Sequence, residues 1–436
     1  MFVSKENFTN GIQFSAIQSD RFKASVLVFS VTVPLSPERM AHQLLLSGLL
    51  RRGTRELPSM SALNRRLDEL YGSYVEIRSS AVGNNLCLTV STEVLDNKFV
   101  PDETDVIGGV IDIISQILLS PHLLDDNFDP QLFTHEQKIV YDNLEAEKNN
   151  TRSYSIKRCA ELLGEEITQA PSYEQLKALV KEASFQDVKQ HHEQLVLPSV
   201  LDVFYMGASA PSVIREKISS CFSRKVCTLQ KNVIPLTPYK RSDFRLVKEK
   251  MTVSQGKLSL GFSTGVIASS DCDNYYTALL LNEIFGGSAS SKLFINVREK
   301  MSLCYYCSSS YSIYTGALMV SCGIEPDKFE IAKNAILAQL DEIRKGNISQ
   351  YEFDAAKKSI SNSYLQLYDS PFDIHSFYSG RELFGIRVSI KDCVSKLMAV
   401  TIDDVTELAK QISLDAVFFI EGTEGCEDFE EDTEND

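Results

Sequence analysis

Residues 41–54 of the chain read AHQLLLSGLLRRGT, a pattern that predicts an amphipathic helix ending at a Gly-Thr turn. The leucines recur at helical spacing, so one face of the helix is apolar and can pack under a sheet. Two strand-like runs precede this helix at residues 11–18 and 24–33, and a second helical stretch follows it at 63–72. The segment therefore belongs to a strand–strand–helix–helix block.

The same order of elements recurs in the second half of the chain, and this internal repeat organises the prediction. Its first four elements are FRLVKEKM (244–251), KLSLGFSTGV (257–266), YYTALLLNEIFGG (275–287) and SSKLFINVREK (290–300). A strand pair and two long helices follow in both halves. Each half then closes with a Ser- or Thr-capped helix and an apolar strand, at 184–207 and 401–422. We expect an α+β fold of two homologous domains, each an antiparallel-rich sheet with helices packed on one face.

The expected domain boundaries lie where the repeat breaks. The N-terminal domain covers residues 1–224, and the C-terminal domain covers residues 244–422. The linker between them, residues 225–243, contains two prolines that interrupt regular structure. Residues 423–436 carry many acids and no base, so self-repulsion predicts a disordered acidic tail.

Composition excludes some classes of partner. The 436-residue chain is 43% hydrophobic and 24% charged, a normal globular balance. Its formal net charge of −15 argues against nucleic acid, because phosphate binding requires a basic face. No apolar run approaches the roughly 20 residues that span a bilayer, and the first residues resemble neither a secretory nor an organellar targeting sequence. We expect a cytoplasmic protein without a membrane partner.

Ten cysteines are scattered without the spacing of a disulfide framework, which favours reduced thiols. The pair Cys304 and Cys307 raises the question of a metal or redox site. The surrounding residues predict a strand, in which positions three apart point to opposite faces. The two thiols are therefore not expected to converge.

The doubled plan, the helix with its Gly-Thr turn and the stretch VREKMSLCYY (297–306) resemble the insulinase/pitrilysin family of zinc peptidases, in its small two-domain processing-peptidase branch. The resemblance extends over about residues 10–420. Members carry an inverted zinc motif, H-x-x-E-H, on the first helix, and a glutamate ligand downstream. Zinc needs both imidazoles on one helix face, a carboxylate as third ligand and a glutamate that deprotonates the bound water.

The motif positions are degenerate in this chain. Counted back from the Gly-Thr turn, they fall on Leu44, Ser47 and Gly48, none of which can hold zinc. The downstream helix has Glu136 at the first glutamate position of the family pattern, but Asn143 stands at the ligand position. An amide oxygen is a poor zinc ligand.

The histidines offer no alternative zinc site in the sequence. A frame shifted to His42 meets leucines where the glutamate and the second histidine are required. The other histidines lack partners at ligand spacing, and the adjacent His191 and His192 diverge on a helix. We expect no metal and no cofactor in this chain, with zinc confined to a partner subunit.

The second family motif is intact. Active members carry an arginine and, seven residues later, a tyrosine that reach the substrate, and Arg298 and Tyr305 match this pair. The glycine that usually lies between them is Ser302 here. A guanidinium and a phenol can both donate hydrogen bonds to a peptide carbonyl oxygen, which gains negative charge in the tetrahedral transition state. The resemblance thus implies substrate binding by these two residues.

Lost zinc ligands and a retained Arg/Tyr pair predict a zinc-less subunit that is inactive alone. On this hypothesis it pairs with a homologous H-x-x-E-H subunit and offers Arg298 and Tyr305 to a peptide or unfolded polypeptide in a cytoplasmic processing reaction. Bacterial members of this zinc-less type are encoded beside a zinc-bearing sister. The alternatives are a structural scaffold, a peptide-binding protein without a role in proteolysis, and an independent peptidase, for which nothing marks a nucleophile–base pair.

Overall fold

The computed structural model describes residues 4–7, 11–164, 168–222, 233–239, 243–268 and 274–423. The expected acidic tail lies outside the described residues except for Thr423, as does much of the expected linker. Contacts divide the chain into two compact units. Unit 1 comprises Met1–Glu145, Gln169–Pro235 and Leu367–Phe384, and unit 2 comprises Ala146–Thr168, Leu236–Gln366 and Gly385–Asp436.

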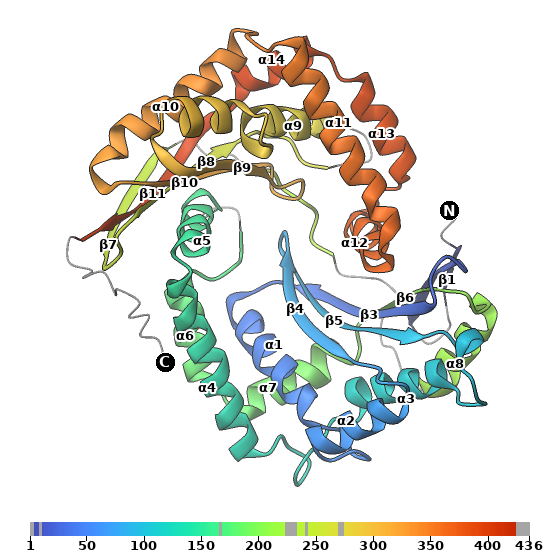
Figure 1. Cartoon of the computed structure of the whole chain (residues 1–436). Coiled ribbons are helices and arrows are strands. Elements are labelled where there is room, and N and C mark those ends of the chain that lie inside the picture. The colour runs from blue at the N-terminus through green and yellow to red at the C-terminus, as the bar shows by residue number, and fades with distance from the viewer. Residues whose placement is uncertain are drawn as a thin grey trace, which may run out of the picture. The chain divides into compact units, whose positions relative to one another are not determined.

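Unit 1 is built on a six-stranded mixed sheet with the order β1-β2-β6-β3-β5-β4 (Figure 1). β2 and β6 run parallel, whereas all other neighbours run antiparallel. The strands are β1 (Ser4–Asn7), β2 (Ile12–Gln18), β3 (Ala24–Pro34), β4 (Glu76–Val82), β5 (Asn85–Leu95) and β6 (Leu201–Gly207).

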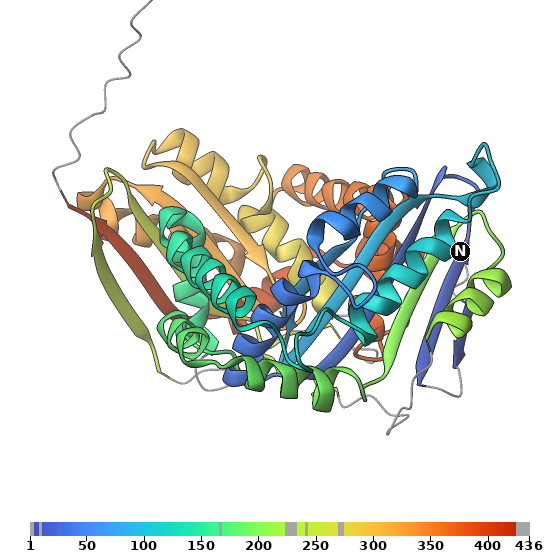
Figure 2. The ribbon, with the colours of Figure 1, turned by 90° about the horizontal axis from the view of Figure 1, so that it is seen from below.

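The main helical layer of unit 1 covers one face of this sheet. On β3, Leu27 and Phe29 are buried in one core with Leu45 and Leu46 of α1, which confirms the predicted apolar face. Each such side chain contributes about 2 kcal/mol through burial. α3 and α8 lie side by side (Figures 1 and 2). The helices are α1 (Pro37–Leu49), α2 (Met60–Glu69), α3 (Val106–Leu119), α4 (Pro130–Ala146), α6 (Tyr173–Glu182), α7 (Phe185–His191) and α8 (Pro211–Cys221), with the short 3₁₀-helices η1 (Leu50–Arg52) and η2 (Asn97–Phe99) and the π-helix η4 (His192–Val196).

Another helix, α12 (Pro371–Glu382), covers the opposite face of the unit 1 sheet. Its Ile374 is buried with Val26 and Val28 of β3 and Phe204 of β6. Val26 and Val28 alternate with Leu27 and Phe29, so they point to the other side of the strand. A helix from late in the sequence thus covers the second face of the first sheet.

Unit 2 repeats the plan with a five-stranded sheet of order β7-β11-β8-β10-β9. β7 and β11 run parallel and the other neighbours antiparallel. The strands are β7 (Arg245–Met251), β8 (Gly256–Ser263), β9 (Cys304–Tyr311), β10 (Ala317–Ile324) and β11 (Ser413–Gly422). The helices are α9 (Asn274–Asn282), α10 (Phe329–Arg344), α11 (Gln350–Gln366), α13 (Ile390–Ala399) and α14 (Ile402–Gln411), with η5 (Glu283–Gly287), the π-helix η6 (Leu293–Lys300) and η7 (Pro326–Lys328); η8 (Leu367–Asp369) falls in unit 1.

The second sheet also receives a helix from the other half of the sequence. α5 (Thr151–Gly164), preceded by η3 (Glu147–Asn149), packs on β8, β10 and β11. Its Ser155 hydroxyl lies 2.8 Å from that of Ser259 on β8. Phe262, an odd number of residues further along β8, contacts Phe285 on the opposite face, with ring centroids 6.3 Å apart. α5 and the main helices therefore cover different faces of this sheet.

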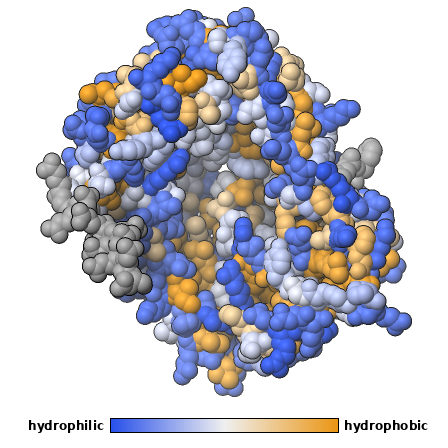
Figure 3. Space-filling view, in the orientation of Figure 1, coloured by the Kyte–Doolittle hydropathy of each residue, from blue (hydrophilic) through white to orange (hydrophobic). Residues whose placement is uncertain are grey.

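The two sheets share strand order and direction apart from the additional β1, which confirms the predicted α+β fold of two homologous parts. The predicted caps Ser184 and Thr401 both form capping boxes. The sequence predicts two domains that are each continuous in the chain, whereas in the structure Ala146–Thr168 belongs to unit 2 and Leu367–Phe384 belongs to unit 1. The helices of these two segments, α5 and α12, were not predicted. In the space-filling view, hydrophilic side chains dominate the visible face and apolar ones are scattered among them (Figure 3). None of the described helices combines the length and apolarity needed to cross a bilayer.

Candidate functional site

The positions on α1 that the resemblance assigns to zinc are used for packing. Leu44 is half-buried, and Ser47 donates its hydroxyl to the Leu44 carbonyl oxygen at 2.8 Å, so this hydroxyl is bonded within its own helix. Gly48 is buried. The three residues offer neither an imidazole nor a carboxylate.

A buried ion pair occupies the space beside Gly48. Glu136 of α4 is 5% exposed, and its carboxylate pairs with the guanidinium of Arg52. A Cβ atom at position 48 would overlap Glu136 Oε2. A histidine at position 48 would therefore have to displace the carboxylate that Arg52 holds.

Asn143 stands seven residues after Glu136 on α4, so the two lie on the same side of that helix. Its side chain is exposed. An exposed amide, a leucine, a serine bonded to its own helix and a glycine do not make a zinc-binding set. The residues present at the expected positions thus do not fit a zinc ion.

The Gly-Thr turn after α1 has its own structural basis. Gly53 has a φ of 144°, and a Cβ there would lie 2.5 Å from the carbonyl oxygen of Leu57. The Thr54 hydroxyl accepts from the Leu57 N–H at 3.0 Å and donates to Gln116 Oε1 at 2.9 Å. Backbone geometry and these hydrogen bonds explain why the turn is present without the zinc ligands.

Two histidines that are far apart in the sequence, and not at ligand spacing, are neighbours in the structure. The ring centroids of His42 on α1 and His191 on α7 are 6.2 Å apart, and His191 Nε2 lies 3.3 Å from Gln43 Oε1. Burial lowers the pKa of His191 to about 3, so its imidazole is neutral at pH 7. Within the described residues no third donor joins the two rings in a group able to hold a metal. No signal in the sequence pairs α1 with α7.

An open cleft of about 910 Å³ in unit 1 borders the α1 positions. Leu44 and Ser47 line it together with residues of β4, β5 and the start of α12. β4 is the outer strand of the sheet, and within the described residues no strand pairs with its outer side. An edge strand can bind an extended peptide through main-chain hydrogen bonds. The cleft therefore combines a wall of side chains with an edge strand.

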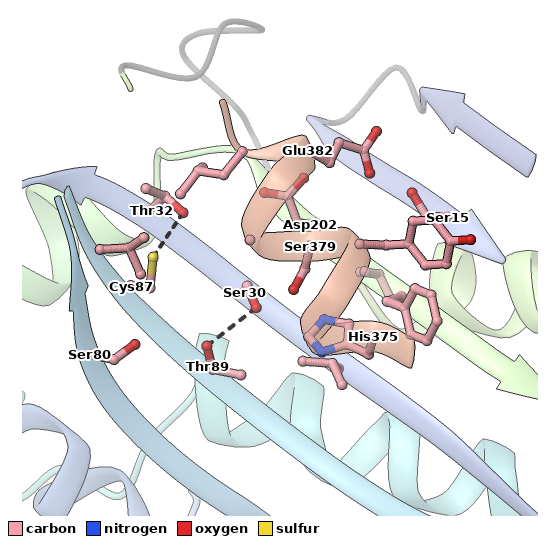
Figure 4. Close-up of a pocket in the computed structure, with 17 residues that line it drawn as sticks. Ser15, Ser30, Thr32, Ser80, Cys87, Thr89, Asp202, His375, Ser379 and Glu382 are labelled. Carbon is pink, nitrogen blue, oxygen red and sulfur yellow. Dashed lines mark hydrogen bonds between the residues drawn. The ribbon is translucent and has the colours of Figure 1, made fainter. Parts of the chain in front are cut away.

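A smaller pocket of about 170 Å³ with several hydroxyl groups in its lining adjoins this cleft, between the sheet and α12 (Figure 4). Val28, Ser80, Thr89 and His375 line both cavities. Figure 4 shows the hydroxyls of Ser30 and Thr89 facing one another, at 3.4 Å. The pocket extends the polar lining of the cleft beneath α12.

The Arg/Tyr pair lies in unit 2, at the outer strand of the second sheet. Tyr305 on β9 is 72% exposed. Arg298 near the end of η6 has its Nε 3.6 Å from Glu299 Oε1, and its guanidinium lies over the Phe294 ring at 4.5 Å. Ser302 between them has a φ of 49°, a left-handed conformation that favours the glycine of the family motif. Both side chains of the pair are accessible to a ligand.

The expectation that Cys304 and Cys307 diverge is wrong. Cys307 pairs with Cys322 of β10, but the register then shifts, so that Ile324 pairs with Cys304 and not with Tyr305. This bulge adds a residue to β9 and returns Cys304 to the face of Cys307. The three sulfur atoms lie within 4.8 Å of one another. Alternation along a regular strand could not reveal a register shift that the neighbouring strand imposes.

Known proteins share both the sequence pattern and the fold. The model of the family described as "Peptidase M16 inactive domain" matches residues 182–360. The chain is 27% identical to "Probable inactive metalloprotease YmfF" of Bacillus subtilis, over 95% of this chain and 97% of that protein. It is 28% identical to "Uncharacterized zinc protease YmxG" of the same bacterium, over 38% of this chain and 41% of that protein.

Solved structures match over nearly the full length. A conserved protein from Enterococcus faecalis V583 has a TM-score of 0.89 at 24% identity, covering 100% of both chains. A peptidase M16 inactive domain from Pseudomonas fluorescens has a TM-score of 0.78 at 15% identity, covering 97% of this chain and 99% of that one.

The fold and the altered α1 helix together define a non-catalytic homologue of zinc peptidases. The chain resembles the peptidase M16 family in sequence and fold, and it is similar along almost its whole length to YmfF, a protein described as a probable inactive metalloprotease. The expected resemblance to the insulinase/pitrilysin peptidases is thus confirmed.

Proposed function

We propose that the chain is the zinc-less subunit of a heteromeric insulinase-like peptidase that processes peptides or unfolded polypeptides in the cytoplasm. In this role it pairs with a homologous subunit carrying an intact H-x-x-E-H helix, closes the chamber around the substrate and supplies Arg298 and Tyr305 to bind it. One contrast carries the proposal: Arg52 and Glu136 beside α1 are held in a largely buried ion pair, whereas Tyr305 is exposed and the Arg298 side chain is partly exposed.

The chemistry of the pair suits a substrate carbonyl group. Arg298 and Tyr305 both carry hydrogen-bond donors, and an oxygen that gains negative charge during peptide hydrolysis attracts them more strongly than the ground-state carbonyl does. A hydrogen bond to a charged group is worth about 1.5 to 3 kcal/mol, which corresponds to roughly 10- to 100-fold in rate. The zinc and the general base would come from the partner subunit.

Two relatives from one bacterium support the idea of a partner. Bacillus subtilis contains one relative described as an inactive metalloprotease and another described as a zinc protease. A zinc-bearing chain of the second kind would supply the metal that Leu44, Ser47 and Gly48 cannot bind.

The proposal is tested by co-expressing this chain with the zinc-bearing paralogue of its own genome and purifying the complex. Hydrolysis of a mixture of unstructured fluorogenic peptides is then measured. We expect no hydrolysis by this chain alone and turnover by the pair. Arg298→Ala and Tyr305→Phe should each lower kcat/KM by about 10- to 100-fold, because each removes a donor to the transition state.

Two exposed residues of unit 2 provide matched controls. Tyr351 is 75% exposed on α11, and Arg387 is exposed before α13. Tyr351→Phe and Arg387→Ala should leave turnover unchanged. Wild-type turnover by the Arg298→Ala pair would refute the role in the transition state, and failure of the two chains to copurify would refute the partnership.

The cleft beside β4 favours a second candidate, a peptide-binding or scaffold protein with no part in proteolysis. If the chain is a peptide-binding protein, an unstructured peptide binds it in the absence of any partner subunit, and the affinity is equal for the wild type and Arg298→Ala. A stable complex with a partner that hydrolyses nothing would favour the scaffold. Fluorescence anisotropy with the peptides of the turnover assay separates these candidates from the first.

A further inference from the structure

Unit 2 contains three neighbouring thiols that the proposed function does not use. Cys304 is half-buried, whereas Cys307 and Cys322 are 3% and 0% exposed. Their sulfur atoms all lie within 4.8 Å of one another. In the part of the chain that the structure describes, this is the one group of three His, Cys, Asp or Glu side chains whose ligand atoms converge closely enough for a metal ion.

The backbone of two paired strands builds this arrangement. Cys307 and Cys322 face each other across β9 and β10, and the bulge at Tyr305 brings Cys304 to the same face. β10 lies between β8 and β9 and is buried along its whole length. A packed inner strand and a fixed bulge therefore hold the three sulfurs together before any ligand arrives.

The three thiols influence one another's acidity. Hydrogen bonds from the Cys307 and Cys322 thiols lower the pKa of Cys304 to about 4, with a smaller contribution from the charge of Arg298. The same hydrogen bonds to Cys304 raise the pKa of Cys307 and of Cys322. The thiolate is the form of cysteine that binds metals, and the convergence of the three sulfurs is what suits them to one ion.

We propose that Cys304, Cys307 and Cys322 form a zinc site with three thiolate ligands and a water molecule as the fourth. Binding of Zn²⁺ displaces the protons that the thiols carry, because the metal binds the thiolate form. Tetrahedral zinc with Zn–S bonds of about 2.3 Å places sulfurs about 3.8 Å apart, within reach of the observed separations. Cys304 is the most exposed of the three and lies where water reaches the ion.

Charge and geometry favour zinc over a disulfide bond. Three thiolates and Zn²⁺ carry a net charge of −1, which the nearby Arg298 balances. A disulfide would use two sulfurs and leave the third without a role, although both other thiols hydrogen-bond to Cys304. The zinc site would also fix the bulge that carries the exposed Tyr305. This zinc site lies in unit 2, whereas the proposed function concerns the missing catalytic zinc beside α1. The proposal needs neither a partner subunit nor proteolysis, so it does not depend on the proposed function.

The test uses the full chain, reduced with a phosphine and freed of metal by a chelator. Co²⁺ serves as the spectroscopic probe, and we expect one Co²⁺ per chain, a thiolate-to-cobalt charge-transfer band and the visible bands of a tetrahedral ion. Zn²⁺ should abolish these bands by displacement. Cys304→Ser should weaken Zn²⁺ binding by more than about 100-fold, beyond what the loss of an outer-shell partner causes.

Cys221→Ser is the matched control, because Cys221 is also partly buried but lies on α8 in unit 1. It should bind Co²⁺ like the wild type, and circular dichroism checks that both variants are folded. Absence of the charge-transfer band in the wild type, or its persistence in Cys304→Ser, would overturn the proposal. A mass loss of two hydrogens on exposure to air, without metal binding, would identify a disulfide instead.

Discussion

The two units share one sheet topology but differ in how they place two of their charged side chains. The residue after β5 in unit 1 is Asp96, which is fully buried, whereas the residue after the equivalent strand β10 is the exposed Glu325. In the same sense, Arg52 of unit 1 is held in an ion pair with the buried Glu136, while Arg298 of unit 2 is accessible. At these positions the repeated scaffold buries charged groups in unit 1 and leaves them at least partly exposed in unit 2.

The largest expected difference concerns Asp96. Its carboxylate accepts hydrogen bonds from the Ser25 hydroxyl at 2.5 Å and from the Ala208 and Ser209 N–H groups at 3.0 and 3.1 Å. Asp96→Asn should lower the free energy of unfolding by about 3 kcal/mol, because these bonds lose their charge. Glu325→Gln should change it by less than about 0.5 kcal/mol. Urea unfolding followed by circular dichroism measures both, and equal losses would remove the contrast.

The same carboxylate makes a prediction about pH. Burial alone would raise the pKa of Asp96, but hydrogen bonds from Ser25, Lys98 and Ser209 outweigh it and hold the pKa below its usual value. The unfolded chain then takes up the proton first, so stability is present above about pH 4 and is lost below it. Asp96→Asn should lose less stability than wild type between about pH 5 and pH 3. Burial lowers the pKa of His191 to about 3, so protonation of this residue also reduces stability at low pH, equally in the wild type and in Asp96→Asn.

A smaller effect is expected from the two arginines. Arg52→Met leaves the Glu136 carboxylate buried without its partner and should cost about 2 kcal/mol. Arg298→Met should cost less than about 0.5 kcal/mol, because that side chain is partly exposed and leaves no buried charge without a partner. The double variant Arg52→Met with Glu136→Leu should recover most of the loss, since no charge stays buried. If Arg298→Met destabilised as much as Arg52→Met, the division of roles between the units would be wrong.

The smallest effect concerns the turn that joins helix to outer strand in each unit. Gly72, after α2, has a φ of 67° with open space around it, and Ser302, after η6, has a φ of 49°. A left-handed conformation costs a residue with a Cβ atom about 1 kcal/mol relative to glycine. Ser302→Gly should therefore stabilise the chain by about 1 kcal/mol, and Gly72→Ser should destabilise it by about as much. Thermal unfolding of the two variants measures both, and a shift in the same direction would contradict this view.

Local patterns in the sequence predict most of the elements and miss one long-range feature of the fold. Period-two and helical spacing place β3 and α1, and the caps Ser184 and Thr401 mark helix starts because a cap is a local hydrogen bond. The positions of α5 and α12 follow from which sheet each helix covers. That choice depends on contacts between residues far apart in the chain, which spacing does not encode.

The candidate site divides in the same way. Leu44, Ser47 and Gly48 can be recognised from the spacing of a motif, because ligands on one helix must recur at fixed intervals. The side chain that fills the space beside Gly48 is Glu136, which comes from another helix. The motif predicts the position of Glu136 in its own helix but not its contact with Gly48. The convergence of the three thiols depends on a register shift between β9 and β10, which a strand considered by itself does not show.

The position of α12 late in the sequence has a consequence for folding during synthesis. The apolar side chains of β3 that Ile374 covers are synthesised early, and α12 emerges only after most of unit 2 has left the ribosome. Until then, one face of the first sheet, including Val26 and Val28, has no cover from its own helix. Such late, non-local pairing slows folding and prolongs exposure of apolar surface. We therefore expect the nascent chain to need protection from aggregation while its first half has been synthesised and α12 has not.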